Sequence, residues 1–476
     1  MATTAIDHAP AHTLEPIDVQ LGPGRIIFIT GPSGSGKSTA LRSIESRCPA
    51  ALNVERVRFP EERSVVDGVC PGRPLTDALS TLSACGLSES PLWLRRPDEL
   101  SDGQRFRARL ARAVGLIART NSSGPLLCDE FCSGLHRRLA RSIAFNLRKL
   151  ATRRGWCLVL ASSDDDFAAD LQPDITVRLS ERGKAQVVES SPRRRPFSLA
   201  RRAVIAPGRK ADYDAFAAMH YRATDELGFV DSVFVLRDGP DGDVLAIVVY
   251  AHGPMELALR NQATHGRFVK NPDRLNRNVR ILRRLVVHPD VRGCGLGHWL
   301  VRRTMPLVGT RYVECLASMG EINPVFEKSG MTRIGTCTLP DAPARAVEHL
   351  NALGVDPFAL DFADHVARRP RVRRIVAHAV YRWYQATTGG GDRRVVRQSA
   401  AFLAQTFRGI VGSRPVYYLW ERPSCARRAA RVRHDSTPRP SRRRQEQTPT
   451  SPDRKPRTQN NRDRRTPARN EQDETN

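Results

Sequence analysis

Residues that could hold a nucleotide phosphate stand together near the N-terminus, in the stretch GPSGSGKST. This stretch fits the pattern G-x-x-x-x-G-K-[ST], in which glycines let backbone N–H groups approach phosphate oxygens. Lys37 would reach the β- and γ-phosphates, and the hydroxyl of Ser38 would bind Mg²⁺. We therefore expect ATP and Mg²⁺ to be held by the residues of this loop, Gly31, Pro32, Ser33, Gly34, Ser35, Gly36, Lys37, Ser38 and Thr39.

Two stretches downstream contain residues that would complete a phosphate-transfer site. The first is LSDGQ, where Ser101, Gly103 and Gln104 open a predicted helix and offer a second place to hold an anion. The second is PLLCDEF, an apolar run that contains two neighbouring acids. This run resembles a Walker B motif, and the resemblance implies that Asp129 holds Mg²⁺ through water and that Glu130 polarises the water that attacks the γ-phosphate.

The three stretches, in this order, resemble the Walker A, signature and Walker B motifs of ABC-type ATPases. That resemblance implies ATP hydrolysis by a homodimer, in which the signature serine of each subunit completes the site of the other. The sequence departs from the family at His136, which replaces an aspartate of the D-loop, and at Ser163 or Asp164, one of which replaces the switch histidine. These departures imply slow hydrolysis, or the use of ATP as a switch.

A second glycine-rich stretch, VHPDVRGCGLG, connects a predicted strand to a predicted helix. Loop amides and a helix N-terminus in this arrangement can hold a pyrophosphate. The stretch resembles motif A of the GNAT acetyltransferases, and this resemblance implies acetyl-CoA, or another acyl-CoA, as a ligand. The residues that it implies for acyl-CoA binding are Val286, Val287, Arg292, Gly293, Cys294, Gly295, Leu296, Gly297 and Asn323.

The second site lacks one of the catalytic residues that many GNAT members have. Phe326 stands where many GNAT members have the tyrosine that protonates the leaving thiolate, so that hydroxyl is absent. Glu314, in the preceding predicted strand, could act as the base for an amine acceptor. Its alternative interpretation is a charge at the edge of a strand.

Predicted secondary structure and composition divide the chain into five parts. Apolar runs that alternate with amphipathic patterns predict an α/β fold with a parallel sheet for residues 1–190, the ABC-type ATPase domain. A linker rich in proline and arginine, 191–202, precedes a GNAT-like α/β domain at 203–340. A basic helical extension follows at 341–425. Residues 426–476 have too few apolar side chains to form a core, and we expect them to be disordered.

Charge and composition bound the partners. Lys and Arg number 76 against 50 acids, a formal net charge of +26, which favours a polyanion such as nucleic acid. Arginines near Tyr381, Trp383 and Tyr384, and again in RPVYYLWER, suit stacking on unpaired bases, with helix packing as the alternative. The sequence has no apolar run of about 18 residues and no signal peptide at its N-terminus, so we expect a cytoplasmic protein.

Three functions fit these features. The first is an ATP-dependent acyltransferase that acts on nucleic acid, or on a protein bound to it. The second is a nucleic-acid modification enzyme of the GNAT superfamily that transfers a group other than acetyl. The third is a nucleotide-switched binding module that keeps the fold of the second domain without its chemistry.

Overall fold

The computed structural model describes residues 16–60, 62–120, 124–191, 195–219, 227–388, 393–412 and 414–423. Met1–Arg422 cluster into one compact unit and Pro423–Asn476 into a second, so the described residues belong to the first unit apart from Pro423. The tail that we expect to be disordered, 426–476, lies outside the described residues. Within the described ranges, no helix combines the length and the apolar character needed to cross a bilayer.

The first sheet has six strands and is parallel except at one edge, where β5 and β6 are antiparallel. The apolar runs IIFIT and LVLAS form the two central strands β1 and β4. A strand whose two faces are both covered needs apolar residues on both faces, and these runs provide them. In spatial order the strands are β2 (Leu52–Asn53), β3 (Leu126–Cys128), β4 (Leu158–Ser162), β1 (Ile26–Thr30), β5 (Ile175–Leu179) and β6 (Ala185–Glu189).

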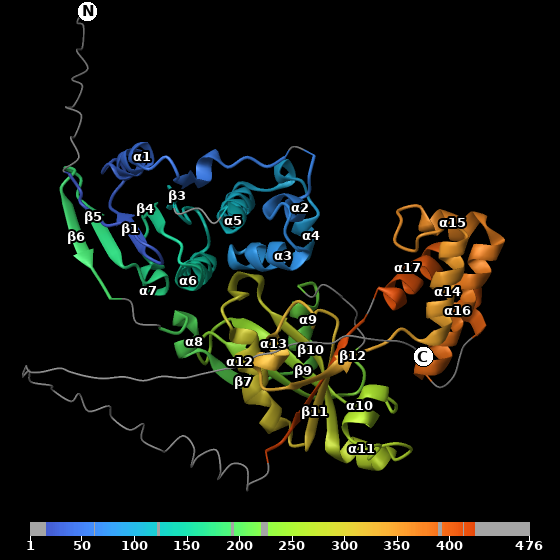
Figure 1. Cartoon of the computed structure of the whole chain (residues 1–476). Coiled ribbons are helices and arrows are strands. Elements are labelled where there is room, and N and C mark those ends of the chain that lie inside the picture. The colour runs from blue at the N-terminus through green and yellow to red at the C-terminus, as the bar shows by residue number, and fades with distance from the viewer. Residues whose placement is uncertain are drawn as a thin grey trace, which may run out of the picture. The chain divides into compact units, whose positions relative to one another are not determined.

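Alternate residues of β1 enter two separate hydrophobic cores. Ile26 and Phe28 pack with residues of α5 and α6, whereas Ile27 and Ile29 pack with residues of α1. The two long amphipathic patterns in the sequence are confirmed as α5 and α6 (Figure 1). The helices of this region are α1 (Lys37–Arg47), α2 (Val65–Val69), α3 (Leu75–Ala84), α4 (Ser90–Trp93), α5 (Asp102–Thr120), α6 (Arg137–Arg154) and α7 (Ala168–Leu171), with 3-10 turns η1 (Val54–Arg56) and η2 (Pro97–Glu99).

The second sheet has seven strands, and β10 and β11 are its parallel pair. They pair only from Val279 to Leu282 of β10, although β10 continues to Val287, so the two strands separate beyond that point. In spatial order the strands are β12 (Thr332–Thr336), β13 (Val416–Glu421), β11 (Tyr312–Ala317), β10 (Val279–Val287), β9 (Val244–Ala251), β8 (Val230–Arg237) and β7 (Val204–Pro207).

Short helices connect these strands. The longest of them follows the glycine-rich loop after β10 and packs its apolar side, including Leu300 and Val301, into the core of the second sheet. The helical elements here are α8 (Ser198–Arg202), α9 (Lys210–Ala217), α10 (Ala258–Ala263), α11 (Pro272–Asn278), α12 (Leu296–Thr304) and α13 (Val325–Lys328), with 3-10 turns η3 (Pro289–Val291) and η4 (Met305–Val308).

The helical extension is an insertion between two neighbouring strands of the second sheet. Its helices α14 (Asp341–Ala352), α15 (Phe362–Arg368), α16 (Pro370–Thr388) and α17 (Ala400–Val411), with the 3-10 turn η5 (Arg393–Arg397), share a hydrophobic core of their own (Figure 1). The chain then returns as β13, which pairs with β11 and β12. The structure therefore differs from the predicted extension 341–425 at its C-terminal end, because β13 belongs to the sheet and not to the extension.

Candidate functional site

The phosphate-binding loop joins the buried end of β1 to the start of α1. Gly31 lies so close to β5 that a Cβ atom there would stand 2.3 Å from the carbonyl oxygen of Leu179. Gly36 takes the left-handed conformation, with φ 97°, immediately before the helix. Both positions thus require glycine for geometric reasons, as the motif predicts.

Lys37 closes this loop on itself. Its ammonium donates to the carbonyl oxygens of Gly31, at 2.8 Å, and Pro32, at 2.7 Å. Pro32, Ser33, Gly34, Ser38 and Thr39 are exposed to solvent. The hydroxyl of Ser35 is buried and makes no hydrogen bond to a described residue. A phosphate seated here would meet one ammonium, a helix N-terminus and open backbone.

The acidic residues of the site follow β3. β4 lies between β3 and β1, and all three strands are parallel, so the residues that follow them meet at one edge of the sheet. Asp129 is half-buried there, and its Oδ1 accepts the backbone N–H of Glu130 at 2.9 Å. Glu130 is exposed and has a positive φ of 44°, a conformation rare for non-glycine residues.

These residues fit a nucleotide-bound Mg²⁺. Magnesium usually keeps water and substrate phosphate as ligands and takes only one or two groups from the protein. The Ser38 hydroxyl at the start of α1 would be the direct protein ligand, and the Asp129 carboxylate after β3 would hold the ion through one of its waters. Ser163 and Asp164, one of which we expect to replace the switch histidine, follow β4, the strand between them, and both are exposed.

The signature stretch forms an exposed start of α5. Leu100 is buried, whereas Ser101 is exposed and Gly103 and Gln104 are half-exposed. The side chain of Gln104 accepts the backbone N–H of Ser101 at 3.1 Å and so caps the helix. The remaining N–H groups of the first turn have no partner within the helix, and they form a surface on which another molecule's phosphate could rest.

The second glycine-rich loop runs from the end of β10 to α12, and Arg292 anchors it. The guanidinium donates to the carbonyl oxygens of Val287 at 2.9 Å, Met219 at 2.7 Å and Ser88 at 2.6 Å. Ser88 belongs to the ATPase region, and its hydroxyl also donates to the carbonyl of Pro289. Burial lowers the pKa of Arg292, and the charge of Glu89 offsets part of that effect. Arg292 therefore supports the loop with three of its five N–H donors.

Helix α6 of the ATPase region covers part of this loop. The side-chain amide of Asn146 donates to the carbonyl of Arg292 at 3.3 Å, and the Lys149 ammonium donates to the carbonyl of Gly293 at 2.8 Å. Gly293 has φ +80°, and a Cβ atom there would stand 2.9 Å from the Asn146 amide nitrogen. The thiol of Cys294 is buried against the Ser142 carbonyl, and burial raises its pKa to about 12. The ATPase region and the second sheet thus meet at the loop.

The rest of the loop leads into the helix. Gly295 is the left-handed residue before α12, with φ 91°. Leu296 and Gly297 are buried, and a Cβ atom on Gly297 would stand 3.1 Å from the side chain of Val287. Val286 is buried in the core. Asn323 is exposed just before α13.

Glu314 does not have the environment of a general base. Its carboxylate is fully buried and forms a two-pronged ion pair with the equally buried Arg260, at 2.7 Å and 2.9 Å. The hydroxyl of Tyr417 donates to the same carboxylate at 2.8 Å. A base must reach its substrate's proton, so this arrangement corrects the expectation and makes Glu314 part of a structural ion pair. Sequence reasoning missed the pair because Arg260 and Tyr417 are far away along the chain.

Aromatic residues expected to stack on bases are also inside the protein. Tyr417 and Tyr418 are fully buried, and the Tyr418 ring lies 5.4 Å from that of Phe326. Tyr381, Trp383 and Tyr384 are half-buried, and the last two pack against the core of the helical insertion. Core packing, the alternative interpretation, thus holds for β13. The sequence also has arginine-rich stretches at 427–433 and 442–444, and both lie outside the described residues.

His136, at the D-loop position, points to a second contact between the two regions. It is exposed before α6, and its Nδ1 lies 3.9 Å from Oδ2 of Asp290 in η3. The same carboxylate oxygen lies 3.6 Å from Nδ1 of His288. Burial lowers the pKa of His288, against the opposite effect of Asp290. The segment between the Walker B acids and α6 is therefore joined to the approach of the second loop.

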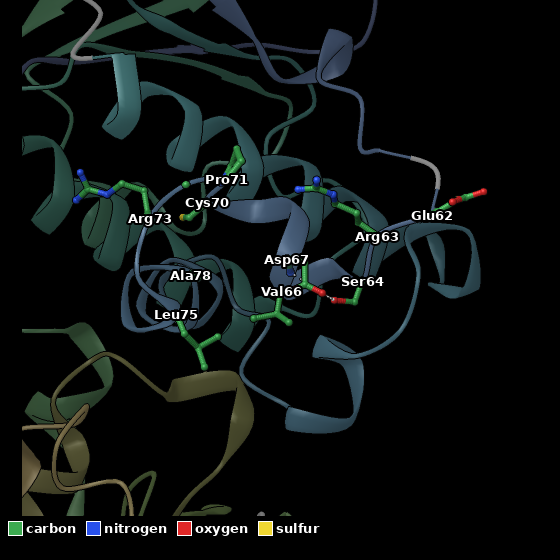
Figure 2. A pocket seen from close by; sticks show the side chains of 11 residues that line it. Glu62, Arg63, Ser64, Val66, Asp67, Cys70, Pro71, Arg73, Leu75 and Ala78 are labelled. Carbon is green, nitrogen blue, oxygen red and sulfur yellow. Dashed lines mark hydrogen bonds between the residues drawn. The ribbon is translucent and has the colours of Figure 1, made fainter. Parts of the chain in front are cut away.

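A shallow depression of about 490 Å³ lies apart from these residues, at α2 and α3 (Figure 2). Three of its polar side chains are paired: the Ser64 hydroxyl donates to Asp67 at 2.5 Å, and Arg73 pairs with Asp77 at 2.6 Å. None of the expected site residues lines it.

The fold and the first site define the N-terminal region, about 37% of the chain, as an ABC-type ATPase domain. No protein-family model matches the chain. The chain is similar to the sn-glycerol-3-phosphate import ATP-binding protein of Burkholderia thailandensis, with 28% identity over 208 residues, 37% of this chain and 55% of that protein. The protein of the same name in Burkholderia lata is 27% identical over the same shares. The chain thus spans about half the length of the curated relatives it matches.

Solved structures give similar matches. A dimeric bacterial ABC transporter cassette is 20% identical, covers 37% of this chain and 90% of its own, and has a TM-score of 0.30. A component of an ABC transporter complex of Clostridium perfringens is 18% identical, with shares of 38% and 82% and a TM-score of 0.30.

Proposed function

We propose that the first domain binds and hydrolyses ATP with Mg²⁺, and that the second is an N-acyltransferase supplied by acyl-CoA. The ATP proposal rests on one edge of the first sheet, where the loop of Lys37 and the acids Asp129 and Glu130 follow parallel strands. Glu130 is the residue that would orient the attacking water, because it is exposed directly after the Walker B strand. Ser101 would complete the site of a second copy in an ATP-bound homodimer.

The acyltransferase proposal is supported by the parallel strands β10 and β11, which pair at one end and then separate. The glycine-rich loop and the N-terminus of α12 follow at the end of β10, where backbone amides can hold a pyrophosphate. This is the arrangement that the resemblance to GNAT acetyltransferases implies. Acetyl-CoA would be the donor, and the acceptor would be nucleic acid or a molecule bound to it, in the cytoplasm.

A second candidate, the nucleotide-switched binding module, is favoured by the chemistry that the second domain lacks. Phe326 has no hydroxyl to protonate a thiolate, and the Glu314 carboxylate is committed to Arg260. A domain that kept only the loop could bind CoA without transferring its acyl group. Transfer of a group other than acetyl to nucleic acid remains the third candidate, and product mass distinguishes it.

Two measurements test these proposals. Lys37→Ala should abolish ATP binding in calorimetry, whereas Arg47→Ala, at the exposed end of the same helix, should leave it intact. Incubation with labelled acetyl-CoA and tRNA, duplex DNA or cell protein should label one acceptor. Binding of acetyl-CoA without any labelled product would favour the binding module, and no binding of acetyl-CoA would refute the second domain's assignment.

The homodimer is tested separately. Glu130→Gln should retain ATP because hydrolysis is blocked while the phosphate contacts remain, and it should elute as a dimer when ATP is present. Ser101→Ala in the same background should return the protein to the monomer, since Ser101 would act on the nucleotide of the other subunit. A Glu130→Gln protein that stays monomeric with ATP bound would contradict the proposal.

A further inference from the structure

Basic side chains from three elements gather at the start of α12. His298 belongs to α12 itself, Lys328 to α13 and Lys149 to α6 of the ATPase region. Arg302, one turn further along α12, adds a fourth basic side chain. Burial lowers the pKa of His298, and the charges of Lys328, Lys149 and Arg302 lower it further. The charged groups that act on Lys149 and His298 are thus lysines and arginines, apart from the Cys294 thiol.

Geometry places Lys149, His298 and the helix that carries Lys328 at the second glycine-rich loop. A Cβ atom on Gly297 would stand 3.6 Å from Val325 of α13. The Lys149 ammonium is 2.8 Å from the carbonyl oxygen of Gly293. A Cβ atom on Gly295 would stand 2.9 Å from the His298 ring, so the ring lies directly beside the loop. The N-terminal N–H groups of α12, which follow Gly295, add their partial positive charge. The positive charges here are the lysines and the helix N-terminus, and their mutual repulsion would be relieved by an anion between them, to which the neutral His298 ring could donate a hydrogen bond.

Lys149 has donors left for such an anion. An ammonium carries three N–H donors, and one of them is directed to Gly293. The side chain is half-buried and its nitrogen lies 5.4 Å from the centre of the Phe145 ring, so its position is constrained by packing. A partly desolvated cation interacts more strongly with a phosphate than one in bulk water does.

We propose that Lys149 of the ATPase domain, together with His298 and Lys328, binds the phosphate groups of acyl-CoA, so that both domains build this site. The inference rests on the proposed function of the second domain. It adds a residue that the second domain cannot supply by itself, and it makes α6 shared between the two nucleotide sites. The same helix begins at Arg137, next to His136 at the D-loop position and in the segment that follows the Walker B acids.

Calorimetry with two probes tests the assignment on the full chain. CoA carries the phosphates and pantetheine does not. Lys149→Met should weaken CoA binding roughly 10- to 100-fold, the range for losing a hydrogen bond to a charged group, and leave pantetheine binding unchanged. Lys149→Arg, which keeps the charge, should recover most of the affinity. Arg154→Met, which removes an exposed cation from the end of the same helix, is the matched control and should bind CoA normally.

The outcomes are separable. Equal weakening of CoA and pantetheine by Lys149→Met would show that Lys149 only supports the Gly293 backbone, as Asn146 supports Arg292, and would overturn the inference. Unchanged CoA binding by Lys149→Met would overturn it as well, while the proposed function would stand. Failure of the wild-type protein to bind CoA would instead remove the proposed function itself.

Discussion

At the scale of single residues, the clearest prediction concerns Glu314. Replacing it by Gln removes the negative charge and leaves the Arg260 guanidinium buried without its partner. Breaking a buried ion pair from one side costs about 3–5 kcal/mol, so Glu314→Gln should lower the unfolding free energy of the second domain by that amount. The measurement is chemical unfolding of both proteins. A variant as stable as wild type, but inactive towards an acceptor, would restore the base role.

His298 gives a prediction on pH. Its pKa in the folded protein lies below the unfolded value of about 6.5, because burial and then Lys328, Lys149 and Arg302 disfavour the imidazolium. Above about pH 6.5 the ring is neutral in both the folded and the unfolded protein, and the folded state keeps its full stability. As the pH falls through the lowered pKa, the unfolded state binds the proton more readily and the folded state loses stability. His298→Gln should lose less stability between neutral and acidic pH than wild type. Parallel stability curves in thermal melts at a series of pH values would contradict this.

Individual residues of the site show which of its features can be predicted from the sequence and which cannot. The glycines of both loops and Lys37 of the first loop can be recognised from local motifs. The structure gives geometric reasons for glycine at positions 31 and 36. The roles of Arg292 and Glu314 could not be predicted, because their partners are distant along the chain: Ser88 for Arg292, and Arg260 and Tyr417 for Glu314. A motif states which residue types are present, and packing decides which of their donors and acceptors remain open to a ligand.

At the scale of elements, Gly293 and Gly309 form a natural pair for testing the contact between α6 and the loop. Both are left-handed, with φ +80° and +88°, so alanine is strained by about 1–2 kcal/mol at either position. Alanine at 309 would meet nothing within 4 Å, whereas alanine at 293 would meet Asn146 of α6. Gly293→Ala should therefore cost more than Gly309→Ala in unfolding experiments. Equal costs would mean that α6 does not press on the loop.

Elements differ in how far the sequence predicts them. β1 and β4 are continuous apolar runs, and α5 and α6 have regular amphipathic spacing, so local pattern suffices. β13 was missed because VYYLWE lies between arginines and after the helical insertion. Its place between β11 and β12 depends on strand pairing that returns across that whole insertion, and no local pattern records such pairing.

At the scale of the whole molecule, the excess of positive charge is the property that the two described sheets do not explain. Many arginines of the described part are used internally: Arg148 pairs with Asp174, Arg280 with Asp231, and Arg292 donates to three carbonyls. Their charge serves folding or the contact between domains. A polyanion partner would therefore depend most on arginines outside such contacts. The stretch 426–476, which lies outside the described residues, is rich in arginine.

Removing residues 426–476 should weaken nucleic-acid binding and leave ATP and CoA affinity unchanged. Arginines that neutralise phosphates release counterions, so the log–log salt slope should fall by roughly 0.7 to 0.9 for every phosphate that the truncated protein no longer neutralises. The loss of affinity should be similar for different sequences, because arginine charge acts on phosphates and carries no base information. Salt titrations of full-length and truncated protein on single- and double-stranded substrates measure this salt slope and the affinity.

Full-length protein with Arg442, Arg443 and Arg444 changed to Gln is the matched control for charge, and it should show part of the same reduction in slope. If truncation leaves slope and affinity as they are, the polyanion assignment moves to the region around Arg368 to Arg374, where Arg371 and Arg374 are exposed three residues apart on one side of α16.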